Sequence, residues 1–421
     1  MMNGDLNYIE VLGTRARTAR TELAAATTAQ KNEARREIAH ILRRSCERIV
    51  DENAKDIKNA KEKGISDAML DRLTLNEKRI ESIANACEYL TKLDDPVGMV
   101  DGGGVRPNGI KVIKTRVPLG TIGIIYEARP NVTVDAAALC LKSGNAVILR
   151  GGSEAYYSNK CLVDLMRMAV ERAGFDPNII QLVENTAREV ATMMMKANGY
   201  IDVLIPRGGA GLIDAVVKNA TVPVIETGKG NCHIYIDESA DLDMAVKVTD
   251  NAKTQRPSVC NAVETCLVHR TVAERFLLKL KKELDKHNVE IRGCKLTKMI
   301  LGRSVVDVTE EDFATEYDDY ILAVRVVDDF GQAIEHIQKY STGHSECIIT
   351  ESLYAAEEFQ RRIDAAAVYV NCSTRFTDGE EMGLGAEIGI STQKLHTRGP
   401  MGLKELTTIK WLINGNGQIR Q

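Results

Sequence analysis

The chain has 421 residues, of which 44% are hydrophobic and 27% charged, and its formal net charge is −4. This composition is typical of a globular protein with room for two or three domains. The slight acidic excess argues against a nucleic-acid partner, which usually requires a basic face. We find no signal peptide and no run of about 20 apolar residues, so we expect a cytoplasmic protein without a membrane partner.

The ten cysteines are scattered along the chain, without a CxxC pair or a Cys/His spacing typical of zinc sites. We therefore expect no metal, and unpaired thiols fit a reducing compartment. Because free cysteine is among the most buried residue types, most of the ten are expected to be inert core residues.

The first part of the chain, residues 6–93, has apolar residues at helical spacing and is predicted to be helical. Residues 109–117 alternate β-branched and charged side chains, which predicts an exposed ribbon. Residues 405–413 have the same character. We expect them to pair with the ribbon or with a neighbouring subunit.

From residue 120 onward, short apolar strands alternate with helical segments, which predicts a parallel sheet with helices on both faces. A second unit of the same kind begins near Ile234. Ligands of such sheets bind where the loops gather at the carboxyl ends of the strands, so we expect four loops of the first unit to converge. The strands predicted there are 121–126, 146–149, 179–183, 203–205 and 222–225, and the loops are 127–131, 150–153, 206–211 and 226–230.

Two glycine-rich turns follow predicted strands of the first sheet. Backbone N–H groups at a helix start favour phosphate, and an Arg at a strand end can grip a 2′-phosphate. The alternative is an ordinary turn with a surface Arg, but two such turns in one sheet favour a dinucleotide. The residues concerned are Arg150, Gly151, Gly152 and Ser153 in one turn and Arg207, Gly208 and Gly209 in the other.

Cys260 stands between a polar loop and the predicted strand 264–268, where partial exposure would make a thiol reactive. Backbone N–H groups with the amide of Asn131 or Asn261 could hold an oxyanion there. Glu226 could act as a general base or orient water or cofactor. The alternatives are a buried structural Cys and a solvated loop Glu. Three histidines, His233, His269 and His344, are acid–base candidates or structural residues.

Taken together, these segments resemble the aldehyde dehydrogenase superfamily over nearly the whole chain. Residues 118–125 and 143–150 look like the first two cofactor strands, and 226–230 resembles the glutamate loop. Cys260 follows Glu226 by 34 residues, close to the spacing of the catalytic thiol. The resemblance implies an α/β fold with two Rossmann-type parallel-sheet domains and a small β element for oligomerisation.

The resemblance also implies a division of the chain. Residues 1–102 and 120–230 are expected to form a cofactor-binding domain, and 231–370 a catalytic domain with the nucleophilic Cys. Residues 103–119 and 383–421 are expected to form an oligomerisation ribbon and tail, so we expect a homo-oligomer.

Longer strings resemble the branch of this superfamily that reduces an acyl phosphate. They imply NADPH-dependent reduction of L-glutamyl 5-phosphate to L-glutamate 5-semialdehyde in proline biosynthesis, with a functional link to glutamate 5-kinase. An aldehyde-oxidising or CoA-acylating member, or an inactive binding module of the same fold, is the alternative. The strings are 126–133, 149–152, 226–233, 259–265, 343–346 and 385–392.

For single residues, the resemblance implies that Cys260 forms a thioester and that Asn131 donates to the oxyanion. Glu226 is not needed as a hydrolytic base, because the reductive direction uses no water. Arg150 and Ser153 are expected to bind the 2′-phosphate, with the two glycine-rich turns, Gly228 and Glu316 as further cofactor contacts. Arg129, Lys229, Arg375 and Arg398 are unranked candidates for the charged ends of the substrate.

Overall fold

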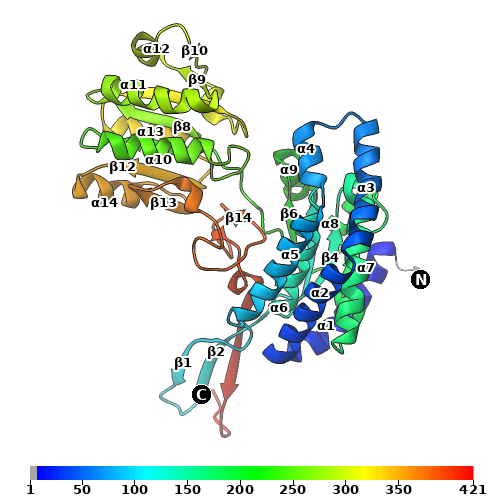
Figure 1. The fold of residues 1–421 in the computed structure, drawn as a ribbon. Coiled ribbons are helices and arrows are strands. Elements are labelled where there is room, and N and C mark those ends of the chain that lie inside the picture. The colour runs from blue at the N-terminus through cyan, green and yellow to red at the C-terminus, as the bar shows by residue number, and fades with distance from the viewer. Residues whose placement is uncertain (1–6, 421) are drawn as a thin grey trace. The chain divides into compact units, whose positions relative to one another are not determined.

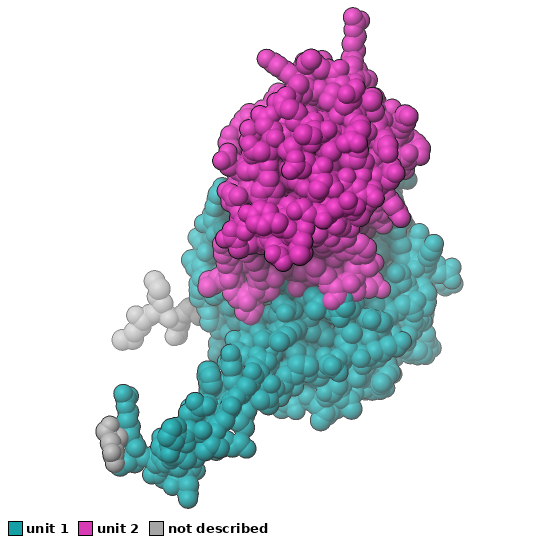
Figure 2. Space-filling model, turned by 90° about the vertical axis from the view of Figure 1, so that its left-hand side faces the viewer, with its two compact units in different colours: residues 1–227, 383–389, 401–421 teal, residues 228–382, 390–400 magenta. Residues whose placement is uncertain are grey.

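The structure is a computed structural model that describes residues 7–420, with all side chains except those of Asp67, Ala68 and Ala210. Two compact units are coloured separately in Figure 2. Unit 1 comprises the described residues up to Thr227 together with 383–389 and 401–420, and unit 2 comprises 228–382 and 390–400. The chain therefore passes from unit 1 to unit 2 directly after Thr227.

The N-terminal part of unit 1 is helical, as predicted. Asn7 and Thr27 begin the first two helices with capping boxes, which satisfy backbone N–H groups of the first turn. The helices are α1 (Tyr8–Ala25), α2 (Thr28–Arg44), α3 (Cys46–Glu62), α4 (Asp67–Leu73) and α5 (Glu77–Tyr89).

A four-stranded parallel sheet forms the centre of unit 1, in the order β5-β4-β3-β6. All residues of β3 are buried, as expected for a parallel strand covered on both faces. One face packs against α2, α5, α6 and α7, and the other packs against α1 and α8 (Figure 1). The bounds are β3 (Thr121–Tyr126), β4 (Ala146–Arg150), β5 (Ile180–Leu182), β6 (Val203–Arg207), α6 (Pro130–Lys142), α7 (Tyr156–Arg172), α8 (Arg188–Met195) and α9 (Ala210–Asn219).

The strand predicted at 222–225 is wrong. This segment makes a single bridge, between Leu204 and Val224, and no regular ladder. Pro223 lacks a backbone N–H and so cannot donate to a neighbouring strand. The loop 226–230 therefore does not follow a strand of the first sheet.

An antiparallel ribbon in unit 1 consists of β1 (Val100–Val105), β2 (Lys111–Pro118) and β16 (Thr407–Asn414). The predicted pairing of 405–413 with the ribbon is confirmed, with Pro118 opposite Thr407 and Lys111 opposite Asn414. Figure 1 shows the ribbon extending away from the helices of unit 1. Trp411 and Ile413 on the edge strand β16 are 58% and 63% exposed.

Unit 2 is built on a seven-stranded parallel sheet in the order β10-β9-β11-β8-β7-β12-β13. Alternate residues of β7 point to opposite faces: Ile234 packs with α10 and α11, and Tyr235 packs with α13 and α14. The strands are β7 (Cys232–Ile236), β8 (Val263–His269), β9 (Glu290–Gly293), β10 (Val306–Asp307), β11 (Ile321–Val327), β12 (Ser345–Ile349) and β13 (Ala367–Val370), and the helices are α10 (Leu242–Thr254), α11 (Ala273–Leu284), α12 (Lys295–Leu301), α13 (Phe330–Tyr340) and α14 (Leu353–Arg362).

Two parallel α/β sheets and a small antiparallel ribbon confirm the predicted fold class. A two-stranded pair, β14 (Ile390–Ser391) with β15 (Gly399–Pro400), completes unit 2. Across residues 7–420, no helix has the length and apolar character needed to cross a bilayer.

Candidate active site

Cys260 lies in the loop between α10 and β8, and its side chain is partly exposed. Gly230 precedes β7 and Glu316 precedes β11, and these strands flank β8 in the sheet. Three loops therefore meet at the amino-terminal edge of the unit 2 sheet, whereas the usual ligand position in open α/β sheets is the carboxyl edge. The backbone N–H of Gly230 donates to Oε1 of Glu316 at 2.8 Å.

The loop 228–230 is packed against the Cys260 loop without room for a side chain. A Cβ on Gly230 would overlap the carbonyl group of Cys260, and one on Gly228 would overlap the side chain of Thr392. The Cys260 carbonyl also accepts a hydrogen bond from the thiol of Cys232 at 3.2 Å. The backbone of the candidate nucleophile is thus fixed by β7 and the loop before it.

Asn261 is 4% exposed and anchors the other side of the Cys260 loop. Its Nδ2 donates to the carbonyl of Thr377 at 2.9 Å and to that of Arg375 at 3.2 Å. Its own carbonyl accepts from the Thr374 hydroxyl at 2.6 Å. Asn261 was one of two amide candidates for the oxyanion, but these bonds make it a structural residue of the loop.

Among the other described thiols, Cys294 is the one whose pKa is lowered, whereas the pKa of the remaining eight is raised. Burial alone would raise the pKa of Cys294, but hydrogen bonds from Thr297 and from the backbone N–H of Val326 lower it below that of an ordinary thiol. The sequence did not distinguish Cys294, because these donors come from another strand and a helix start. Burial raises the pKa of the thiols of Cys46, Cys87, Cys140, Cys161, Cys232, Cys266, Cys347 and Cys372.

The three candidate histidines are all buried and have local partners. His233 Nδ1 lies 3.1 Å from Glu346 Oε2. His344 Nδ1 lies 2.8 Å from the Ser345 hydroxyl, and His269 Nδ1 lies 2.8 Å from that of Thr271. This placement favours the structural alternative for each.

In unit 1, β4, β3 and β6 are neighbours, so the loops that follow them gather at the carboxyl edge of that sheet. The N–H of Glu127 donates to the carbonyl of Arg207 at 3.3 Å. The N–H of Gly209 donates to Oε2 of Glu127 at 2.8 Å. A carboxylate of the protein itself therefore stands at the N-terminus of α9, where the sequence predicted a phosphate.

The turn after β4 holds a half-buried guanidinium. Arg150 Nη2 donates to the carbonyl of Thr186 at 2.8 Å, while its buried Nε has no hydrogen-bond partner in the described structure. Burial lowers the pKa of Arg150. A Cβ on Gly151 would overlap the amide of Asn159, which is itself bonded to Thr133, so this glycine is required by packing.

Asn131 and Glu226 both belong to unit 1. Asn131 lies in the first turn of α6, and its Nδ2 donates to Oδ2 of Asp135 at 3.2 Å. Burial raises the pKa of Asp135 to about 6, although this hydrogen bond opposes the shift. Glu226 is half-buried. The next residue, Thr227, is fixed by a 2.9 Å hydrogen bond to the carbonyl of Pro206.

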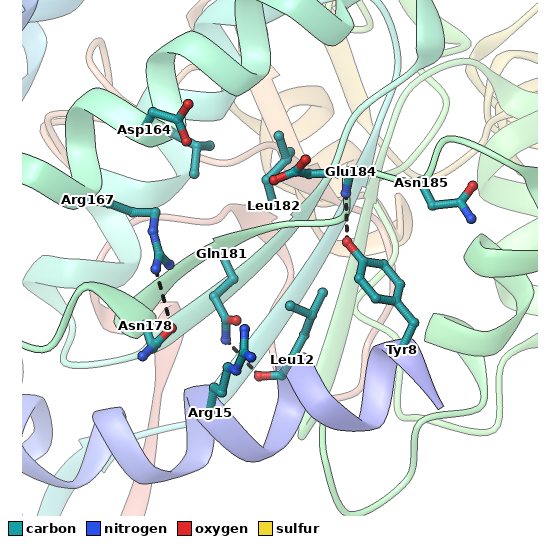
Figure 3. A pocket seen from close by; sticks show the side chains of 11 residues that line it. Tyr8, Leu12, Arg15, Asp164, Arg167, Asn178, Gln181, Leu182, Glu184 and Asn185 are labelled. Carbon is teal, nitrogen blue, oxygen red and sulfur yellow. Dashed lines mark hydrogen bonds between the residues drawn. The ribbon is translucent and has the colours of Figure 1, made fainter. Parts of the chain in front are cut away.

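A cavity of about 710 Å³ in unit 1 lies between α1, α7 and the edge strand β5. Figure 3 shows Arg15 and Tyr8 on α1 opposite Asp164 and Arg167 on α7. Arg167 is held by the carbonyls of Pro177 and Ile180 at 2.9 and 2.8 Å. None of the lining residues belongs to the glycine-rich turns, so this cavity is separate from the predicted cofactor loops.

Among the residues that the structure describes, no group of three or more His, Cys, Asp or Glu side chains could hold a metal ion. Of the four cations proposed for the substrate's charged ends, Arg398 is bound to Asp364 through both Nη atoms. Arg375 instead contacts the Cys260 loop.

Comparison with known proteins gives a consistent result. A family model described as the aldehyde dehydrogenase family matches residues 5–300. The γ-glutamyl phosphate reductase of Clostridium perfringens (strain SM101) is 58% identical over 414 residues, which cover 98% of this chain and 100% of that protein. The γ-glutamyl phosphate reductase of Moorella thermoacetica is 59% identical over 413 residues, covering 98% and 99%. The crystal structure of γ-glutamyl phosphate reductase from Thermotoga maritima matches with a TM-score of 0.96 and 50% identity, covering 99% and 100%.

Proposed function

Because the chain belongs to the aldehyde dehydrogenase family, we propose that it reduces L-glutamyl 5-phosphate to L-glutamate 5-semialdehyde with NADPH, releasing phosphate. The family assignment predicted from the motifs is confirmed. The main support is the near-full-length identity to proteins named for this activity. The partly exposed Cys260, fixed in its loop by Gly230 and Asn261, supplies the group that such a reaction needs.

The chemistry proposed for Cys260 is nucleophilic. Its thiolate attacks the acyl carbon, and the developing oxyanion is held by backbone N–H groups near the thiol. The bond from carbon to the phosphate oxygen then breaks, and phosphate leaves with the electron pair. The product on the protein is a thioester. When bound, NADPH supplies the hydride that converts this thioester to the aldehyde and frees the thiolate.

The residues of unit 1 fit a nicotinamide dinucleotide at the turn after β4. Arg150 presents a half-buried guanidinium whose Nε lacks a described partner, which suits a 2′-phosphate. We assign Ser153 to the same phosphate, and Arg207 with Gly208 and Gly209 to the rest of the dinucleotide, as the sequence predicted. An anion at the Gly209 N–H would compete with the Glu127 carboxylate.

Four further assignments stay predictions. Asn131 would have to release Asp135 before its amide could serve an oxyanion. Glu316 would contact the cofactor while it holds the Gly230 N–H. Gly228 and Glu226 keep the roles that the family resemblance implies, a cofactor contact and a carboxylate that is not needed as a base.

The test is the reverse reaction, with glutamate 5-semialdehyde, phosphate and NADP⁺. We expect phosphate-dependent formation of NADPH by the wild type and none by Cys260→Ala, with Cys294→Ser as the matched control that keeps activity. Activity that needs CoA in place of phosphate would identify an acylating reductase. Activity that needs neither would identify an aldehyde-oxidising enzyme, and no activity with any of them would support an inactive module.

We also propose a cytoplasmic homo-oligomer with a functional link to glutamate 5-kinase, as the family resemblance implies. The exposed Trp411 and Ile413 on the edge strand β16 support assembly through the ribbon. Sedimentation of the wild type and of Trp411→Ser tests this assembly, and a wild-type monomer would contradict it.

A further inference from the structure

Arg375 lies beside the Cys260 loop, in the short 3₁₀ helix Thr374–Phe376 that follows β13. Its Nε donates to Oε1 of Gln255 at 2.8 Å, and its Nη1 donates to Oδ1 of Asn261. These two amides stand on either side of Cys260 in the sequence. The guanidinium therefore spans the loop that carries the candidate nucleophile, all within unit 2.

Arg375 differs in its partners from two other half-buried arginines of this protein. Arg292 is bound to Asp312 at 2.7 Å and Arg398 to Asp364 at 2.6 Å. In the described part of the chain, no carboxylate forms an ion pair with Arg375, and its hydrogen bonds go to neutral amides. A desolvated cation without a counter-ion is unfavourable, so the site favours an anion.

A second cation reinforces this charge. The Gln255–Arg375 hydrogen bond brings the neighbouring Arg256 close to Arg375. Burial lowers the pKa of Arg375, the charge of Arg256 lowers it further, and the charges of Asp378 and of the Cys260 thiolate act in the opposite direction. Arg256 is exposed and, within the described residues, forms no ion pair either. Two guanidiniums without an ion pair in the described structure thus act on each other beside the Cys260 loop.

The substrate of the proposed function carries two anionic groups. The phosphoryl group is bonded to the carbon that Cys260 attacks, whereas the α-carboxylate lies at the other end of the molecule. A cation held by Gln255 and Asn261, one before and one after the nucleophile in the sequence, is placed for the nearer group. Two guanidiniums also match the charge of a phosphate dianion, which arginine binds through paired N–H donors.

We propose that Arg375, assisted by Arg256, binds the phosphoryl group of the acyl phosphate beside Cys260. This inference rests on the proposed function. As the Cys260 sulfur bonds to the acyl carbon, the bond from that carbon to the phosphate oxygen breaks and its electron pair leaves with phosphate. The guanidiniums stabilise that charge without a proton transfer. In the reverse direction they hold the attacking phosphate.

The experiment measures the reverse reaction, with inorganic phosphate and glutamate 5-semialdehyde varied separately at saturating NADP⁺. We expect Arg375→Gln to raise the KM for phosphate about 10- to 100-fold, the loss expected for a charge-assisted hydrogen-bonded pair, and to change the KM for the semialdehyde less than about threefold. Arg256→Gln should raise the phosphate KM in the same direction by a smaller factor. Arg303→Gln, an exposed arginine without an ion pair in the described structure, is the control.

If Arg375→Gln disturbs the Cys260 loop, Arg256→Gln still tests the inference, because the side chain of Arg256 makes no hydrogen bond in the described structure that the substitution would break. The rate of Cys260 alkylation by iodoacetamide reports loop placement independently. A lower kcat and slower alkylation with an unchanged phosphate KM would reduce Arg375 to a positioning residue and overturn the inference. A rise in the semialdehyde KM alone would assign the site to the carboxylate and also overturn it. A wild type that needs no phosphate would instead refute the proposed function, and this inference with it.

Discussion

Gly230 lies directly against the carbonyl group of Cys260, so closely that a methyl group on Gly230 would overlap that backbone. Gly230 lies just before β7 and Cys260 lies just before β8, and these two strands are neighbours in the sheet. The position of the thiol therefore depends on the absence of a side chain 30 residues earlier in the sequence.

Gly230→Ala should displace the Cys260 loop, because the atoms that block the methyl group are backbone and cannot rotate away. A shift of about 1 Å in a reacting group costs about 100-fold in rate, so we expect kcat to fall by about that factor. Gly331→Ala is the matched control, since its methyl group would meet only a side-chain oxygen of Asp329, at 3.0 Å, and no backbone atom. Equal kcat values for the two variants would contradict this prediction.

Replacement of Glu226 separates the reductive reaction from hydrolysis. Glu226→Gln should keep most of the reductase activity, because no water has to be activated, whereas Cys260→Ala should lose at least about 1000-fold. Initial rates of NADPH oxidation with γ-glutamyl phosphate measure both. If the two variants lost equal activity, Glu226 would have to act in the chemical step.

Removal of the Arg150 side chain should change cofactor preference. We expect Arg150→Ala to weaken NADPH binding about 10- to 100-fold with little effect on NADH, because only NADPH carries the 2′-phosphate. The ratio of kcat/KM for the two cofactors is the readout. Arg188→Ala, a nearby exposed arginine, serves as control, and an unchanged ratio in Arg150→Ala would reject the assignment.

Cys294 should be alkylated by iodoacetamide at lower pH than an ordinary thiol, because its lowered pKa keeps more thiolate there. Thr297→Val removes one of the hydrogen-bond donors and should shift the pH profile upward. Mass spectrometry of peptides alkylated between about pH 6 and 9 measures the reaction of Cys294 in the wild type and in Thr297→Val. Substrate protection of Cys260 should therefore be measured in Cys294→Ser, and a flat profile for Cys294 would contradict the expected thiolate.

Lys253 and Glu264 form a fully buried ion pair at 2.6 Å in unit 2. Glu264→Gln should lower the free energy of unfolding by about 3–5 kcal/mol, because it leaves Lys253 buried without a counter-ion. The double variant Lys253→Met/Glu264→Gln should recover most of that loss. Urea unfolding measures each, with Lys279→Met in the exposed Lys279–Asp243 pair as a control that changes stability by less than about 1 kcal/mol. Additive losses in the double variant would contradict the coupling.

Local patterns predicted most of the elements correctly. The helical period of the first 90 residues and the apolar runs of β3, β4 and β6 reflect burial of one face or both, which the sequence records directly. The segment 222–225 looked like a further strand, but Pro223 prevents a regular ladder. The sequence was also misleading for Asn261, since an amide beside a thiol can serve an oxyanion or hold a loop, and only its partners distinguish the two.

Cys260 as the candidate nucleophile, the α/β class and the family were determined by the sequence alone, because they depend on local strings and their spacing. The contact of Gly230 with Cys260, the unusual thiol of Cys294 and the hydrogen bonds of the Arg375 guanidinium to neutral amides were decided only by the tertiary structure. Each of them joins residues from separate loops of one sheet. Close packing, desolvation and hydrogen bonding between such loops arise only when the strands have paired in their final order.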